Sequence, residues 1–133
     1  MKKEPTLDYV VATLHEDPGV YIKDIDKDTL TKVITNSGTE YTIRILDHKQ
    51  KLVEITGNGN FFKSPTKVFL SGSVVSNISS ILIVGWIGLN WCIEVILLTR
   101  EEGVLPQIVV TSTIRKIFLD GIQIIPIDNH LQN

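Results

Sequence analysis

The chain has 133 residues, the length of one typical domain, which is enough to bury a single hydrophobic core. Hydrophobic residues make up 43% and charged residues 21%, a composition that excludes an intrinsically disordered chain. The net charge is −2 and like charges do not cluster, so the sequence offers no basic stripe for nucleic acid or anionic lipid and no acidic tail. We therefore expect a single domain over residues 1–133.

The N-terminal residues and the cysteine content indicate an intracellular protein. The segment that starts Met1-Lys2-Lys3-Glu4-Pro5 has no apolar region and no small-residue cleavage site of a secretory signal. Cys92 is the single cysteine and cannot form an intramolecular disulfide, and its apolar surroundings predict a buried, inert thiol. We expect a cytoplasmic location.

The first apolar pattern predicts a short N-terminal helix. Leu7, Val10, Val11 and Leu14 follow the i, i+3, i+4, i+7 spacing of one helix face, with Thr6 in position to cap the helix and Asp17-Pro18-Gly19 in position to end it. A first strand is the alternative, because Tyr9 to Thr13 is also rich in strand-forming residues.

From Gly19 onward, short apolar runs separated by turn residues are typical of a β protein. Asn36-Ser37-Gly38 predicts a hairpin turn, and Tyr41, Ile43 and Ile45 then alternate with polar residues as in a half-buried strand. Leu52 to Ile55 adds a third strand. The pattern predicts a three-stranded meander over Leu30 to Ile55.

The C-terminal half contains further strand signals. Val68 to Leu70 and Gln107 to Val110 are short apolar runs, and Thr111 to Lys116 is interpreted as a polar strand end. Asp120-Gly121 predicts the tight turn of a second hairpin, and Pro126 either confines the last strand to an edge or ends it.

Ile81 to Leu98 is the most hydrophobic segment, and its 18 residues reach the lower limit for a membrane-spanning helix. Such a helix would place Glu94 within the hydrocarbon, at a cost of about 2–3 kcal/mol. The segment is dense in β-branched and aromatic residues, and Gly88-Leu89-Asn90 supplies turn chemistry. We predict two buried strands joined by a tight turn, and no membrane partner.

Together these patterns predict an all-β, mainly antiparallel fold. We expect about eight strands in a small β-barrel or a two-sheet sandwich, with a possible short N-terminal helix.

The sequence contains no recognisable catalytic or metal-binding motif. His15, His48 and His130 are scattered through polar segments, so we expect no metal, no cofactor and no catalytic residues. Asp24, Asp26 and Asp28 alternate as in a calcium loop but lack the glycine and glutamate that such a loop needs, which favours a solvated turn.

Two groups of aromatic residues are the candidate binding sites. Phe61, Phe62 and Lys63 follow a Gly- and Asn-rich stretch and could anchor a protein partner, although at least one of the two rings is expected in the core. Trp86, Asn90 and Trp91 surround the predicted turn, where they could line a ligand pocket or close the core.

The function predicted first is a non-enzymatic β module that binds a protein partner or its own copy, through an exposed sheet edge or the Phe61-Phe62 segment. The alternative is an oligonucleotide- or small-ligand-binding barrel that uses aromatic stacking with Lys63, Lys67, Arg115 and Lys116. Nucleic acid is disfavoured because the composition contributes no net positive field. An enzyme is the third hypothesis and would need a concave pocket with converging titratable groups.

Overall fold

The fold is all β, as the sequence predicts. The computed structural model describes residues 17–75, 81–97, 103 and 105–126, and within these ranges it contains ten strands and one short 3₁₀ turn over Ile22–Asp24. The strands are β1 (Gly19–Tyr21), β2 (Leu30–Thr35), β3 (Glu40–Asp47), β4 (Leu52–Gly57), β5 (Thr66–Val74), β6 (Leu82–Val84), β7 (Trp86–Gly88), β8 (Cys92–Leu97), β9 (Gln107–Leu119) and β10 (Ile122–Ile125). The predicted N-terminal helix from Leu7 to Leu14 and its alternative strand lie outside the described residues.

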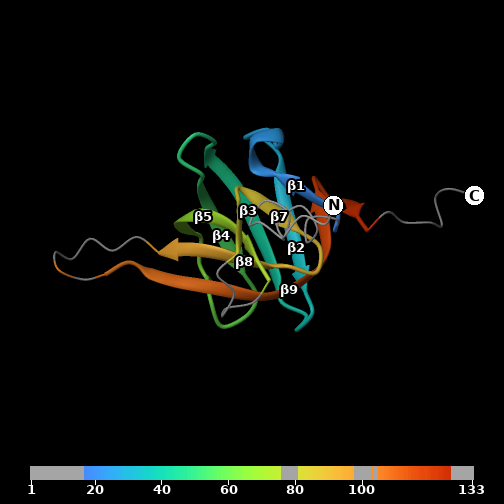
Figure 1. The fold of residues 1–133 in the computed structure, drawn as a ribbon. Coiled ribbons are helices and arrows are strands. Elements are labelled where there is room, and N and C mark those ends of the chain that lie inside the picture. Colours follow the sequence, from blue (N-terminus) through green and yellow to red (C-terminus); the bar gives the residue numbers. More distant parts are fainter. Residues whose placement is uncertain (1–16, 76–80, 98–102, 104, 127–133) are drawn as a thin grey trace, which may run out of the picture.

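Six strands close into an antiparallel barrel (Figure 1). The order around the barrel is β2, β3, β4, β5, β8 and β9, and β9 pairs back with β2. This closure decides between the two architectures that the sequence left open, in favour of the barrel. Among the described residues, no helix is long and apolar enough to cross a bilayer.

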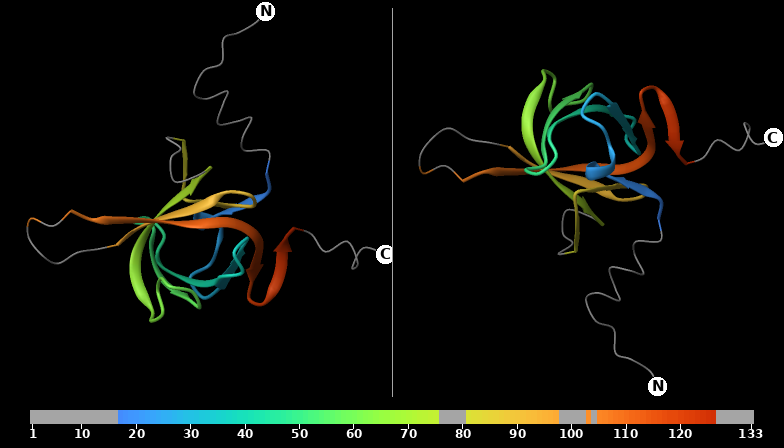
Figure 2. Two further views of the ribbon diagram at one scale, coloured as in Figure 1. Left: turned by 90° about the horizontal axis from the view of Figure 1, so that it is seen from below. Right: turned by 90° about the horizontal axis from the view of Figure 1, so that it is seen from above.

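The remaining four strands add to the outside of the barrel. β6 pairs with the second half of β5, and β10 folds back on the end of β9. β1 and β7 form a separate two-stranded sheet, with Tyr21 opposite Trp86. Figure 2 shows β10 on one side of the barrel, opposite the side on which β8 and β9 project away together.

The barrel interior is filled by alternate side chains of the strands. On β3, Tyr41, Ile43 and Ile45 are buried while Arg44 between them is exposed, which is the alternation that the sequence predicts. The other strands contribute in the same way, and the largest wholly buried residues of this core include Ile55, Leu70, Ile93, Ile114 and Ile117. A barrel of six strands is narrow, so side chains occupy its centre.

The hairpin turns predicted at Asn36-Ser37-Gly38 and Asp120-Gly121 form where the sequence places them. Gly38 has φ +88° in the β2–β3 turn, where the Thr35 N–H donates to the Thr39 carbonyl oxygen at 2.9 Å. Asp120 and Gly121 both have positive φ in the β9–β10 turn, as a two-residue type I′ turn requires. β10 pairs with β9 and with no other described strand, and it ends immediately before Pro126, as predicted.

Two predictions about the C-terminal half are wrong. The Ile81 to Leu98 segment does turn at Leu89-Asn90, but its described part, residues 81–97, contains three strands, and the two that flank this turn do not pair with each other. Instead, β7 pairs with β1 in the two-stranded sheet, and β8 pairs with β5 in the barrel. Thr111 to Lys116 does not end a strand either, since β9 runs unbroken through it.

Candidate interaction site

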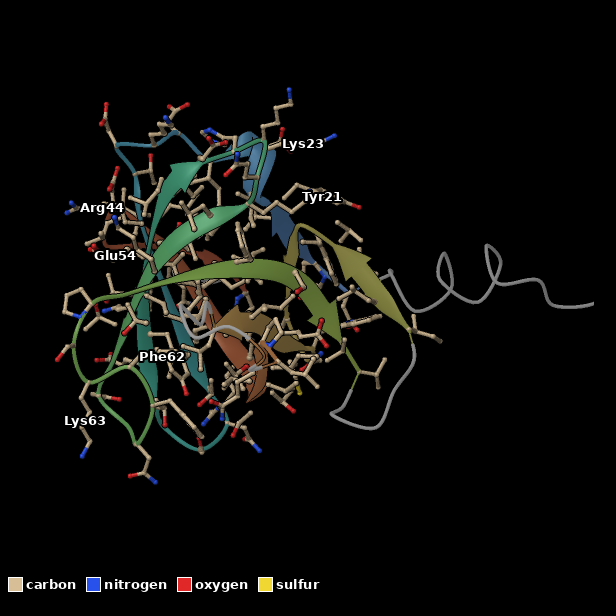
Figure 3. The ribbon with its side chains drawn as sticks, turned by 90° about the vertical axis from the view of Figure 1, so that its left-hand side faces the viewer. Tyr21, Lys23, Arg44, Glu54, Phe62 and Lys63 are labelled. Atoms are coloured by element: carbon tan, nitrogen blue, oxygen red, sulfur yellow. The ribbon has the colours of Figure 1, made fainter. Side chains whose placement is uncertain are left out.

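The Phe61, Phe62 and Lys63 segment divides between core and surface. Phe62 is buried with φ +61°, and its ring packs edge-to-face on Tyr41 with 6.3 Å between ring centroids. Burial raises the pKa of the Tyr41 phenol above its ordinary value of 10.0. Phe61 is 49% exposed and Lys63 points outward beside Phe62 (Figure 3). A partner contact here would therefore rest on Phe61 and Lys63, and it stays a prediction.

Trp86, Asn90 and Trp91 are brought together, but they pack tightly. The two indole rings pack edge-to-face with 5.4 Å between their centroids, and each tryptophan is 2% exposed. Asn90 Nδ2 and Trp91 Nε1 donate to the two carboxylate oxygens of Asp17, at 3.3 and 3.2 Å. The two cavities described below are not lined by these three side chains, so a ligand pocket at this place stays a prediction.

The described residues contain no cluster of three or more His, Cys, Asp or Glu side chains that could hold a metal ion. Asp24, Asp26 and Asp28 are all exposed, and Cys92 is buried. His15 and His130 lie outside the described residues. His48 lies in the turn that follows β3, where Nε2 hydrogen-bonds to the Ile25 carbonyl oxygen.

A strand edge, rather than an aromatic cluster, is the most distinctive surface feature. β9 has 13 residues, and its second half, from Ile114 onward, is paired with β2. Its first half, Gln107 to Thr113, pairs with β8 on one side, and no described strand covers the other side. The last contact before this open edge is the hydrogen bond from Asn36 N–H to the Thr113 carbonyl oxygen, at 2.7 Å.

The open edge of β9 is longer than that of the other uncovered strands among the described residues. β6 and the two strands of the β1–β7 sheet have three residues each, and β10 has four. Figures 1 and 2 show that β8 and β9 project from the barrel side by side, so barrel strands do not shield the edge. An accessible row of backbone N–H and C=O groups is a template for another strand.

An apolar row on the outer barrel surface leads to this edge. Leu52 on β4 lies opposite Phe69 on β5, Phe69 opposite Ile96 on β8, and Ile96 opposite Ile108 on β9. Their sequence neighbours Val53, Val68, Val95 and Val109 are buried in the barrel, so the row itself faces outward. The first three residues of the row are partly buried, whereas Ile108 at its end is 59% exposed.

A polar groove lies along the same edge. It has a volume of about 420 Å³ and is lined by Asn36, Ser37, Cys92, Val110, Thr111, Ser112 and Thr113. Thr111 and Ser112 form an irregularity in the β8–β9 pairing, and the Thr111 hydroxyl there accepts the N–H of Ile93 at 2.9 Å. The groove therefore offers hydroxyl and amide groups without a charged side chain.

Sequence reasoning named an exposed edge in general terms but did not locate it on β9. The signal was the run from Gln107 to Thr113, which contains no charged residue and no proline, the residues that commonly protect an edge.

No protein-family model matches the chain, and no curated protein or solved structure is significantly similar to it.

Proposed function

We propose that this chain is a self-associating β module, in which the open edge of β9 pairs with the same edge of a second copy. The observation that carries the proposal is the uncovered stretch of β9 from Gln107 to Thr113, next to the exposed Ile108. The partner strand would run antiparallel, which joins the two barrels into one continuous sheet.

The energy of such a contact would come from two sources. Each backbone hydrogen bond formed across the interface contributes about 0.5–1.5 kcal/mol after the loss of water is included. The apolar row would contribute more, because a second strand beside β9 removes Ile108 from water and extends the row Leu52, Phe69, Ile96, Ile108 by one residue.

A second copy fits this edge because a symmetric interface must be compatible with itself. In a two-fold antiparallel pair, any charge near the centre of the edge would meet its own copy. Gln107 to Thr113 contains no charge, so this repulsion is absent. The irregularity at Thr111 and Ser112 bends the strand, which limits regular pairing to the stretch around Gln107 to Val110.

The test compares two lysine substitutions at exposed isoleucines on edge strands. Ile108 on β9 is 59% exposed, and its matched control, Ile122 on β10, is 69% exposed. We expect the unmodified chain to shift from monomer to dimer in light scattering between about 1 and 300 μM. Ile108→Lys should weaken the dimer by about tenfold or more, because the two symmetry-related cations would lie close to each other, whereas Ile122→Lys should leave it intact.

Hydrogen exchange identifies the edge independently of the mutations. Alternate amides of Gln107 to Val110 should gain protection as the protein concentration rises. A monomer at every concentration would overturn the proposal. A dimer that Ile108→Lys leaves unchanged, with no added protection on β9, would place the interface elsewhere and also overturn it.

A further inference from the structure

A second cavity lies at the end of the barrel that carries the 3₁₀ turn, and it is lined by cationic groups. Its volume is about 200 Å³, and its walls are Tyr21, Ile22, Lys23, His48, Lys51, Val84 and Gly85. Two of these side chains are lysines, one is an imidazole, and none is a carboxylate. We propose that this cavity is an anion-binding site for a phosphate group.

Lys23 and His48 are each held at the cavity by a separate contact. Lys23 Nζ lies 5.3 Å from the centroid of the Tyr21 ring, a cation–π arrangement. The His48 ring is fixed by its hydrogen bond to the Ile25 carbonyl oxygen. Because a carbonyl can only accept, Nε2 carries a proton and donates it to this bond. Groups held in advance of binding lose less conformational entropy when the ligand arrives.

Lys51 is held by an unusual backbone conformation. Its φ is +56°, in the left-handed region that residues other than glycine, asparagine and aspartate seldom adopt. Its side chain runs over Gly85, where a Cβ would lie 3.3 Å from Lys51 Cε. The missing side chain at Gly85 therefore leaves room for the lysine chain. A strained residue of this kind, directed at a cavity, is a reason to look for a ligand there.

The charges of the two lysines are not neutralised by neighbours. Within the described part of the chain, the one ion pair joins Lys32 to Glu40 on β2 and β3, and neither Lys23 nor Lys51 takes part in one. The Asp47 carboxylate, next to His48, accepts the Gln50 N–H at 3.1 Å. An entering dianion would therefore meet two ammonium groups without displacing a carboxylate.

The cavity also has an apolar wall, which bears on the source of the phosphate. Tyr21 and Val84 border it, and Val84 is 56% exposed at the rim. Free inorganic phosphate would use the cationic groups, whereas a phosphomonoester would also pack its organic part against this wall. Figure 3 shows Tyr21 and Lys23 at one end of the molecule and Phe62 and Lys63 at the other, so this site is separate from the Phe61-Phe62 segment.

The test is a titration of the full chain with inorganic phosphate at low ionic strength, followed by amide chemical shifts. We expect saturable shifts at Tyr21, Lys23 and Gly85, with sodium chloride at equal ionic strength causing none. The double variant Lys23→Gln, Lys51→Gln should weaken binding by about tenfold or more. The matched control Lys63→Gln, Lys67→Gln removes the same charge from exposed positions and should leave the affinity unchanged.

Equal losses in the two double variants would overturn the site, because they would indicate attraction by overall charge. Absence of saturable shifts at the three amides up to tens of millimolar phosphate, on the order of the weakest specific affinities, would overturn it as well. A parallel titration with phenyl phosphate separates the sources. Tighter binding than inorganic phosphate supports an organic phosphate, and equal binding supports the free anion.

Discussion

At the scale of single residues, Thr31 buries a hydroxyl group that has no hydrogen-bond partner among the described residues. Its side chain is 0% exposed, and its hydroxyl is the one buried side-chain polar atom without a hydrogen-bond partner among the described residues. Thr35 lies four residues further along β2 and is also buried, but its hydroxyl has hydrogen-bond partners. Its hydroxyl lies 2.9 Å from the Ser37 hydroxyl and donates to the Thr39 carbonyl oxygen at 3.3 Å.

We expect opposite effects when each threonine is replaced by valine. Thr31→Val removes an unsatisfied hydroxyl and should raise the free energy of unfolding by about 1 kcal/mol. Thr35→Val breaks the turn contacts and should lower it by about 1 kcal/mol. Urea denaturation at constant pH measures both, and a loss of stability in Thr31→Val would mean that this hydroxyl has a partner in solution.

Residue-level conformations were also the least predictable from the sequence. Gly38 and Gly121 were expected in turns because glycine tolerates positive φ. Lys51 and Phe62 have positive φ as well, yet nothing in their residue types indicates it. Both residues make contacts distant in sequence, Lys51 over Gly85 and Phe62 with its ring against Tyr41, which a local pattern does not encode.

At the scale of elements, the β1–β7 sheet depends on two glycines that face one indole ring. Gly19 and Gly88 lie opposite each other in this sheet, and a Cβ on either would overlap the ring atoms of Trp86. The absence of side chains allows Trp86 to lie flat on both backbones. Gly88 has no positive φ, so any penalty for a substitution there comes from the overlap and not from the backbone.

Gly88→Ala should therefore destabilise the chain by roughly 2–3 kcal/mol, the usual range for overpacking a buried site. It should also shift the tryptophan emission to longer wavelength, because Trp86 must leave its buried position. Gly121→Asn is the control, since nothing lies within 4 Å of a Cβ there and asparagine tolerates its φ of +82°. Unchanged emission and stability in Gly88→Ala would contradict this account of the sheet.

The sequence predicted elements where the determinants are local and failed where they are distant. Asn36-Ser37-Gly38 and Asp120-Gly121 specify their hairpins through turn conformation alone, and the alternation on β3 specifies its inner face. The pairing of β7 with β1 joins residues about 67 positions apart, and no local pattern encodes it. The cavity lined by Lys23, His48 and Lys51 was missed for the same reason, because three separate segments form it.

At the scale of the whole molecule, two hydrophobic clusters border the same strands, β5 and β8. The barrel core includes Ile93 and Val95 of β8, whereas Ile83, Trp86 and Trp91 form a smaller cluster outside it. Ile87 of β7 packs in the barrel core, and a buried serine adds a second connection between the two clusters. Ser73 Oγ on β5 donates to the Trp86 carbonyl oxygen at 2.6 Å and accepts the Gly88 N–H at 3.2 Å.

Because β5 and β8 belong to the barrel and also border the smaller cluster, we expect both clusters to unfold in a single transition. Both tryptophans lie in the smaller cluster, so their fluorescence reports on it, while circular dichroism in the far ultraviolet reports mainly on the barrel strands. In urea the two signals should give coincident midpoints for the unmodified chain.

Ser73→Ala should separate the two signals. The substitution removes the donor to the Trp86 carbonyl oxygen and the acceptor of the Gly88 N–H, and the loss of these two buried hydrogen bonds should cost about 1–3 kcal/mol. This loss falls on the β1–β7 sheet and leaves the barrel pairing intact, so the fluorescence midpoint should move to lower urea than the circular dichroism midpoint. If the two curves instead move together by the same amount, the smaller cluster has no independent stability and the barrel cannot persist without it.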